Sequence, residues 1–350
     1  MAPNRRRDPS PPPGPGANGP LVLTTQPGWA FATLAELRSR GVTEIVPFSH
    51  RDSTIVLTDH DSIGPWKLTT VAEAFGGVAL SEPFAEEDAT ATLVKQLSSE
   101  NFKTAIMSWL PQTTSGRLRR YSVSVESYGR AEYTRMHLDD VVEAAIHKVF
   151  PRWHRGGTGS LRFFCKTDPA MSFVGVQIYA GVGGDNDRMP GSLRSHLAAG
   201  LLSLADIRPS DTVLDPFMGS GTILHIASST FEANQTIGVE IDSEAFGIAK
   251  NRLADHNASL TLGSFEDIDL TKLPNGTKLV SNVPFGDKFP SVRTTNLVEL
   301  VGRVTRERIP FALLLDRGQA QYLANRVRCR VKNVLVLGRP AAIAYITPWV

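Results

Sequence analysis

A short glycine-containing loop between an apolar strand and a helix constrains the fold of this chain most. Residues Val213 to Thr222 read Val-Leu-Asp-Pro-Phe-Met-Gly-Ser-Gly-Thr. Glycines at a strand end let the backbone approach a ligand closely, and the helix that follows presents free N–H groups. The pattern predicts the first strand–helix unit of a doubly wound α/β domain, with a ligand site where the strand ends. A tight turn that needs its glycines only for geometry is the alternative.

Short apolar strands alternate with helices on both sides of this loop, which predicts a parallel sheet. We expect strands at 212–214, 236–239, 279–280 and 311–315, a closing hairpin of 334–337 and 341–346, and helices over 193–204 and 246–253. We therefore predict an α/β fold in which a Rossmann-like domain spans 189–350. It follows a disordered Pro/Gly-rich arm, 1–20, and an α+β region, 21–180.

The loop excludes two common nucleotide sites. A phosphate-binding P-loop would need a Gly-Lys-Ser/Thr sequence, and a dinucleotide fingerprint would need a third glycine. A nucleoside ligand without a pyrophosphate fits better. Glu240 ends the next predicted strand, 25 residues after Asp215. A carboxylate there can accept hydrogen bonds from both hydroxyls of a ribose. Asp242, or Ser243 beside it, is expected to cap the following helix.

A third signal lies at the end of the strand that begins at Leu279. Residues 281–286 read Ser-Asn-Val-Pro-Phe-Gly. They offer an amide oxygen at Asn282, a backbone carbonyl at Val283 and an aromatic face at Phe285. Two acceptors on one exocyclic amino group would favour its pyramidal, nucleophilic form and relieve the charge of a transition state. A turn in which Asn and Pro have their usual roles is the alternative.

The nearly neutral net charge of +2 hides an uneven distribution. Residues 21–100 hold 5 Lys/Arg against 11 Asp/Glu, whereas residues 101–166 hold 11 against 5, with tyrosines and tryptophans among them. Basic and aromatic side chains together are typical of a surface that binds nucleic acid. An ordinary module with a basic face is equally compatible. The candidate RNA-binding side chains are Arg117, Arg119, Arg120, Arg130 and Arg135.

In the region 21–180 we expect a strand over 121–125, a helix capped by Asp139, and strands over 161–164 and 173–179. A short helix over 34–37 should stop at Gly41. The two cysteines exclude a disulfide framework and a Cys-rich zinc site, and the eight histidines show no ligand spacing, so we expect no metal. No apolar run reaches the roughly 18 residues of a membrane helix. We expect a cytoplasmic protein, a monomer without a membrane partner.

These residues carry a resemblance. Asp215 to Gly221, Glu240 and Asn282 to Phe285, in this order, resemble class I S-adenosylmethionine-dependent methyltransferases that act on amino groups. The segment Met189 to Arg194 and the form Val-Pro-Phe-Gly-Asp-Lys after Asn282 narrow the match. They are similar to the THUMP-domain guanine-N2 methyltransferases of tRNA. Thr24 to Gly28 resembles the ferredoxin-like segment of that family, and 120–178 would be the THUMP domain.

The resemblance implies roles for individual residues. Cofactor binding falls to Asp215, Phe217, Gly219, Gly221, Thr222, Glu240, Ile241, Phe265, Asp267 and Asn282. Catalysis falls to Asn282, Val283, Pro284 and Phe285, with the target base flipped out and stacked on the phenylalanine. Ser264 stands where the family usually has an acid for the adenine amino group, so Asp267 or a backbone group would substitute.

The resemblance thus implies N2-methylguanosine formation in tRNA. Three alternatives remain open: guanine-N2 methylation of ribosomal RNA, methylation of DNA adenine or protein glutamine by related motifs, and an RNA-binding protein whose methyltransferase domain has decayed. The basic segment favours RNA over protein, because a glutamine methyltransferase needs no such surface. The intact Asp215, Glu240 and Asn282 oppose decay.

Overall fold

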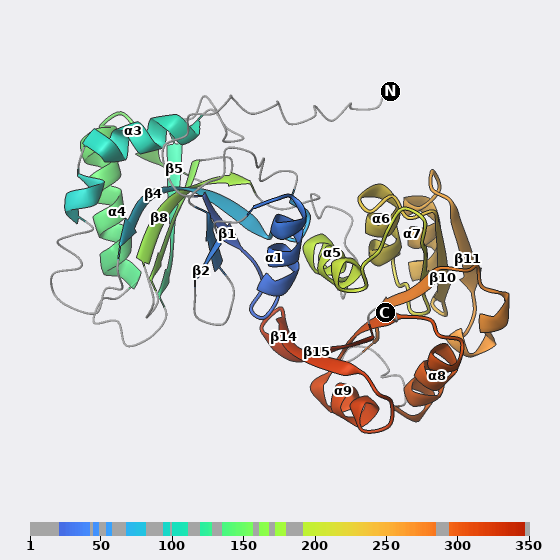
Figure 1. Ribbon diagram of the computed structural model, residues 1–350. Coiled ribbons are helices and arrows are strands. Elements are labelled where there is room, and N and C mark those ends of the chain that lie inside the picture. Colours follow the sequence, from blue (N-terminus) through green and yellow to red (C-terminus); the bar gives the residue numbers. More distant parts are fainter. Residues whose placement is uncertain are drawn as a thin grey trace, which may run out of the picture. The chain divides into compact units, whose positions relative to one another are not determined.

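The computed structural model describes residues 21–42, 45–48, 54–57, 68–81, 94–98, 100–110, 120–127, 135–156, 161–167, 172–179, 192–284 and 294–346. Contacts divide the chain into two units, each with a sheet of its own (Figure 1). The N-terminal unit comprises 1–24, 42–67 and 72–180, and the C-terminal unit comprises 25–41, 68–71 and 181–350. No helix of the described residues is both long and apolar enough to cross a membrane.

The N-terminal unit is built on a mixed eight-stranded sheet of order β2-β3-β1-β4-β8-β7-β5-β6. The β5 strand pairs in parallel with β6 and β7, and every other pairing is antiparallel. The strands are β1 (Leu21–Thr24), β2 (Ile45–Phe48), β3 (Thr54–Leu57), β4 (Glu73–Ser81), β5 (Arg120–Ser127), β6 (His154–Arg155), β7 (Leu161–Thr167) and β8 (Ser172–Tyr179).

Two helices of this unit, α3 (Glu100–Trp109) and α4 (Arg135–Val149), pack on the sheet through a shared apolar core. The α4 helix begins four residues before Asp139, so the prediction that Asp139 caps it was wrong. Asp139 lies inside the helix, and its carboxylate instead binds Arg155 at 2.6 Å. Spacing alone could not show this, because the apolar positions start only at Leu138.

The C-terminal unit has a seven-stranded sheet of order β11-β10-β9-β12-β13-β15-β14. Its first five strands run parallel, and β15 and β14 add an antiparallel hairpin. The strands are β9 (Thr212–Asp215), β10 (Gln235–Glu240), β11 (Ala258–Leu262), β12 (Thr277–Asn282), β13 (Phe311–Leu315), β14 (Arg330–Val336) and β15 (Arg339–Ile346). This is the predicted Rossmann-like sheet, and its order reverses between β9 and β12, where such sheets bind ligands.

Helices cover both faces of this sheet. Alternate strand residues pack against α5 (Ser195–Leu204), α6 (Thr222–Ser229) and α7 (Ser243–Arg252) on one face. The other face packs against α8 (Thr294–Arg306) and α9 (Arg317–Ala324). Because β13 is covered on both sides, all five of its residues are apolar and buried. The predicted doubly wound architecture is thereby confirmed.

A segment from near the start of the chain packs on this unit. The helix α1 (Ala30–Ser39) contacts α5, and Trp29 just before it lies in the same core, only 2% exposed (Figure 1). The Trp29 Nε1 donates to the Leu335 carbonyl at 2.9 Å, and the Leu335 amide donates to the Pro27 carbonyl at 3.0 Å. Residues 25–41 and 68–71, which we predicted to be part of the N-terminal region, thus pack with the C-terminal unit.

Candidate active site at the carboxyl edge of the C-terminal sheet

The glycine loop leaves β9 and enters α6 as predicted. Gly219 and Gly221 both have positive φ, 54° and 76°. A Cβ on Gly221 would lie 3.2 Å from side-chain carbons of Ala249 and Leu253, whereas one on Gly219 would meet nothing within 4 Å. Glycine is therefore required at position 221 both for the positive φ and for the close packing against α7. Gly219 leaves open space on the side where a ligand could approach.

Asp215 ends β9 and is almost fully buried, at 1% exposure. Its Oδ1 accepts from the Phe217 amide at 3.1 Å and from the Ser281 hydroxyl at 2.5 Å. Burial raises the pKa of Asp215 to about 7, against these two hydrogen bonds and with a smaller contribution from nearby Glu240. A buried carboxyl at a strand end with a raised pKa is a candidate functional group.

Glu240 ends β10, and its carboxylate lies across from the glycine loop. Its Oε2 accepts from the Gly219 amide and its Oε1 from the Asp242 amide, both at 2.8 Å. Each oxygen keeps a lone pair for a further donor, so the group fits a ribose diol. Ile241 beside it is 78% exposed, an apolar side chain without cover at the edge where the base of a nucleoside would lie. Asp242 caps α7 through the Ala245 amide, as predicted.

The loop after β11 brings a second aromatic side chain to this edge. The rings of Phe217 and Phe265 lie 4.8 Å apart. Ser264, where an acid was expected, accepts from the Glu266 amide at 3.3 Å and so caps a short 3-10 helix, Phe265–Asp267. Asp267 is exposed at the end of that turn.

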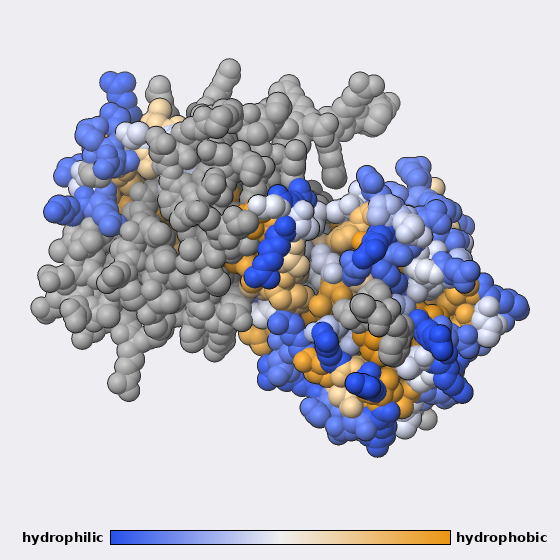
Figure 2. Space-filling model, viewed as in Figure 1, coloured by the Kyte–Doolittle hydropathy of each residue, from blue (hydrophilic) through white to orange (hydrophobic). Residues whose placement is uncertain are grey.

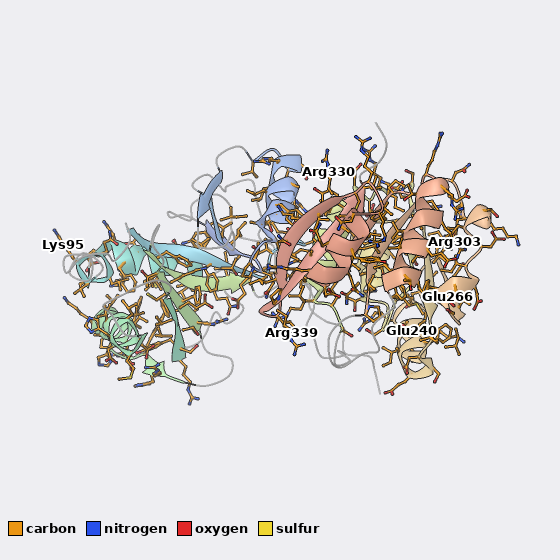
Figure 3. All side chains as sticks on the ribbon, turned by 90° about the horizontal axis from the view of Figure 1, so that it is seen from below. Lys95, Glu240, Glu266, Arg303, Arg330 and Arg339 are labelled. Carbon is orange, nitrogen blue, oxygen red and sulfur yellow. The ribbon has the colours of Figure 1, made fainter. Side chains whose placement is uncertain are left out.

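Side chains of α8 hold this loop in place. Asn296 Nδ2 donates to Glu266 Oε1 at 2.6 Å. Arg303 donates to the carbonyl of Ile268 and, at 3.4 Å, to that of Glu266. Figure 3 shows Arg303 and Glu266 on neighbouring elements near Glu240. The helix that follows residues 281–286 in sequence thus fixes the loop that carries Phe265.

Asn282 ends β12 with a polar atom that lacks a partner. Its Oδ1 is buried and has no hydrogen-bond partner within the described part of the chain. The Val283 amide donates to the Leu314 carbonyl at 3.0 Å, and the Val283 side chain is fully buried. Leaving a buried acceptor unsatisfied costs about 1–3 kcal/mol, so such an atom calls for an explanation. Pro284 follows Val283, and Phe285 lies outside the described residues.

Sequence reasoning missed the residues that support the glycine loop. Arg252 Nη1 donates to the Ser220 carbonyl and to the Thr222 hydroxyl, both at 2.9 Å. The hydroxyls of Ser220 and Ser192 are 2.8 Å apart. Thr222, assigned to the cofactor, therefore uses its hydroxyl inside the protein. Ser281 is the first residue of the predicted motif 281–286, where it was given no role. Arg252 lies 30 residues after Thr222 and gave no signal in the sequence.

The predicted RNA-binding arginines are only partly visible. Arg120 is exposed at the start of β5, and Arg135 begins α4. Arg117, Arg119 and Arg130 lie outside the described residues, so the structure does not test the patch as a whole. Over the ranges that the structure describes, no group of three or more His, Cys, Asp or Glu side chains could hold a metal ion.

The site thus combines two features at one sheet edge. A buried carboxyl and a half-exposed one flank a glycine loop beside Ile241, which suits a nucleoside with a cationic tail. Across the switch point, Asn282 offers an unsatisfied amide oxygen.

The family model of the UPF0020, RMKL-like methyltransferase domain matches residues 185–307. Over these residues the chain is similar to the UPF0020 methyltransferase domain. The prediction of an S-adenosylmethionine-dependent class I methyltransferase domain is confirmed.

Relatives of the UPF0020 domain include RNA methyltransferases. Human THUMPD2, a U6 snRNA (guanine-N(2))-methyltransferase, is 29% identical over 208 residues, which are 58% of this chain and 41% of that protein. The tRNA (guanine(6)-N2)-methyltransferase of Thermus thermophilus is 46% identical over 61 residues, 17% of this chain and 18% of that protein. The chain thus spans less than half the length of these curated relatives.

The fold is shared over nearly the whole chain. The crystal structure of TrmN from Thermus thermophilus superposes with a TM-score of 0.73 at 20% identity, covering 94% of this chain and 99% of that one. The similarity extends through the N-terminal unit, whose sheet the UPF0020 match does not include. The fold prediction, an α+β region followed by a Rossmann-like domain, is therefore confirmed at the level of the chain.

Proposed function

We propose that this protein is an RNA methyltransferase that transfers the methyl group of S-adenosylmethionine to the exocyclic N2 amino group of guanine. The buried, unpartnered Oδ1 of Asn282 carries the proposal. An aromatic amine is a poor nucleophile because its lone pair is delocalised into the ring. An acceptor in this position, with the Val283 carbonyl as the second, binds both amino hydrogens and orients the lone pair toward the methyl donor.

The residues around the glycine loop fit the methyl donor. S-adenosylmethionine supplies an electrophilic methyl group on a sulfonium. Ionised Asp215 would bind the cationic amino group of the methionine part, and the free lone pairs of Glu240 would accept the ribose hydroxyls. Ile241 and Phe265 would enclose the adenine, with the backbone at 264–267 replacing the expected acid. The proton released from the amino group leaves after transfer, so no strong base is required at Asn282.

Within RNA, we propose tRNA as the substrate. The Thermus relative with the highest identity given above acts on tRNA, and Arg120 lies within the basic segment 101–166. The human relative acts on U6 snRNA, which makes that RNA the second candidate. The two share one chemistry, so the same assay separates them.

The test is incubation with labelled S-adenosylmethionine and either unmodified tRNA or a U6 snRNA transcript, followed by nucleoside analysis. Label in N2-methylguanosine from tRNA is the expected result. Label only in the U6 transcript would keep the reaction and change the substrate. Cofactor binding without label in any RNA would contradict the proposal, and so would label in N6-methyladenosine.

A further inference from the structure

The turn of the β14–β15 hairpin has an unusual residue at its tip. Leu337 has φ 51° and Gly338 has φ 80°, the signs of a type I′ turn, whose first position favours Asn, Asp or Gly. A bulky side chain is disfavoured at positive φ. Of the four non-glycine residues with positive φ among those described, Leu337 is the only apolar one.

The Leu337 side chain is not used to build the core. It is 58% exposed, although it is a large apolar group. Figure 2 shows mostly hydrophilic residues on the visible face of the C-terminal unit, with smaller apolar areas among them. A turn that is strained and yet presents a leucine to solvent indicates selection for something other than stability.

Strand register places this tip beyond the active-site edge of the sheet. Asn282 is level with Leu314 on β13, which is level with Ile343 on β15 and through it with Lys332 on β14. The tip lies five residues further in the direction in which β12 ends. Pleat and strand spacing give roughly 20 Å between Leu337 and the end of β12. In Figure 3, Arg339 and Glu240 accordingly lie toward one edge of the sheet and Arg330 toward the opposite one.

The hairpin is held firmly up to its tip. Val334 packs against Gly28, where a Cβ would lie 3.0 Å from the Val334 Cα. β14 is the edge strand, and its Leu335 is hydrogen-bonded on the free side. The Leu335 amide donates to the Pro27 carbonyl, and the Leu335 carbonyl accepts from Trp29 Nε1. The hairpin is therefore anchored as far as Leu335, two residues before Leu337.

The charge of the hairpin indicates the kind of ligand that it contacts. The hairpin, residues 330–346, contains three Lys/Arg and no Asp/Glu. Charged residues also keep edge strands from pairing with other chains, but that role needs charge of either sign. A basic hairpin with an apolar tip matches the proteins that insert an aliphatic side chain beside a nucleic-acid base while cations bind the phosphates.

We propose that the β14–β15 hairpin is a second RNA contact of the active site: Leu337 packs against a base of the substrate outside the pocket of the target guanine, and Arg339 binds the adjoining phosphate. The roughly 20 Å to Asn282 corresponds to several stacked nucleotides at about 3.4 Å each. The contact rests on the proposed RNA methylation. It stabilises the RNA conformation in which the target base has left its stack.

The test compares Leu337→Asn with the wild type. Asn suits the turn better, so the melting temperature should stay equal or rise. The kcat/KM on a folded tRNA transcript should nevertheless fall about tenfold, because insertion of an apolar side chain offsets the cost of unstacking. The kcat/KM on a short single-stranded oligonucleotide with the target guanine, and the affinity for S-adenosylmethionine, should not change. Leu337→Met should retain wild-type activity.

Val331→Thr is the matched control, because Val331 is exposed on β14 at the end far from the turn. It should leave all rates unchanged. If Leu337→Asn methylates the folded transcript as fast as the wild type, the hairpin contact is wrong. If the wild type binds the cofactor but methylates neither RNA, the proposed function fails instead. RNA affinity then tests the hairpin by itself, since Leu337→Asn should still bind the folded transcript more weakly.

Discussion

Two buried polar groups at the active-site edge are the residues whose burial is hardest to justify by stability. Asp215 is held with its pKa near 7, and Asn282 has an acceptor without a partner in the described part of the chain. Each costs free energy in the absence of ligands. The same features prepare one group to bind a cation and the other to bind an amino group.

Asp215→Asn should stabilise the ligand-free protein at pH 8. The folded-state pKa of about 7 is above the ordinary value, so ionisation destabilises the fold as pH rises from about 4 to about 7. Asn keeps an acceptor for the Phe217 amide and the Ser281 hydroxyl without the charge. We expect a gain of about 4 kcal/mol at pH 8, little gain at pH 4, and loss of cofactor binding. Denaturant unfolding at the two pH values measures it, and equal gains at both would contradict the assignment.

The affinity for S-adenosylmethionine should depend on pH through the same group. A cationic ligand binds the ionised carboxylate, so affinity should increase as pH rises from about 6 to about 8, across the pKa of Asp215. Calorimetric titration over this range measures the change. An affinity that is constant over the range would show that Asp215 does not face the charged part of the cofactor.

Asn282→Ala should abolish turnover without harming the fold. Loss of one preorganised acceptor at the reacting atom typically costs 10²–10³ in kcat. Cofactor affinity and melting temperature should stay close to those of the wild type, because the removed oxygen has no described partner. Single-turnover methylation beside a binding titration separates the two effects. Near-normal turnover would remove Asn282 from the chemistry.

Among individual residues, the sequence correctly predicted the site side chains that lie at the ends of strands. Asp215, Glu240 and Asn282 each end a strand of one parallel sheet, so their proximity follows from topology. The capping role of Ser264 could not be predicted, because it depends on a short 3-10 helix for which the sequence has no clear signal. Arg252 was missed because its contacts with the glycine loop depend on where α7 packs.

Among the elements, the helix α1 and the residues before it are the least expected part of the C-terminal unit. Trp29 packs against Gly200 of α5, where a Cβ would lie 2.8 Å from the indole. Glu36 accepts from the amides of Thr69 and Thr70 at 2.9–3.1 Å, which ties a second early segment to the same unit. These elements extend the Rossmann-like core beyond residues 185–307, the part that the family model matches.

Trp29→Ala should destabilise the C-terminal unit by about 3–5 kcal/mol, as expected for removing a buried aromatic side chain. Trp29→Phe keeps most of the apolar contact and loses the hydrogen bond to Leu335, so it should cost about 1 kcal/mol. Equilibrium unfolding followed by circular dichroism measures both. A loss below 1 kcal/mol for the alanine variant would mean that α1 is not part of the folded core.

Element prediction succeeded where an apolar run was long and failed at edges. The buried strand β13 and the closing hairpin were expected, because their residues alternate or run apolar between turn signals. The edge strand β11 (Ala-Ser-Leu-Thr-Leu) was missed, since it is largely exposed and carries no buried stretch. The start of α4 was misplaced because its first turn contributes little to the core.

For the whole molecule, the charge contrast of the sequence makes a prediction about RNA binding. Arg120→Glu should weaken RNA binding and reduce the slope of log affinity against log salt by about 1, because one phosphate contact is lost. Lys95→Glu, the same charge change at an exposed site before α3, serves as the control (Figure 3). Filter binding of tRNA at several salt concentrations gives both slopes. Equal slopes for the two variants would place the RNA elsewhere.

Two units were predicted from the change in pattern near residue 181, but their interleaving was not. A sequence pattern reports local periodicity, whereas residues 25–41 join the C-terminal unit through contacts some 300 positions away, such as Trp29 with Leu335. Segments of that kind are recognised only when the fold is known.

This interleaving determines when the C-terminal unit can fold during synthesis. The segment around Trp29 leaves the ribosome about 300 residues before β14, the strand that binds it. The C-terminal unit therefore closes only after β14 has been made, and the segment around Trp29 stays exposed until then. A fragment trimmed to the UPF0020 match would lack both ends of that closure, and expression of the catalytic part alone requires residues 25–41 to be supplied, in cis or as a separate peptide.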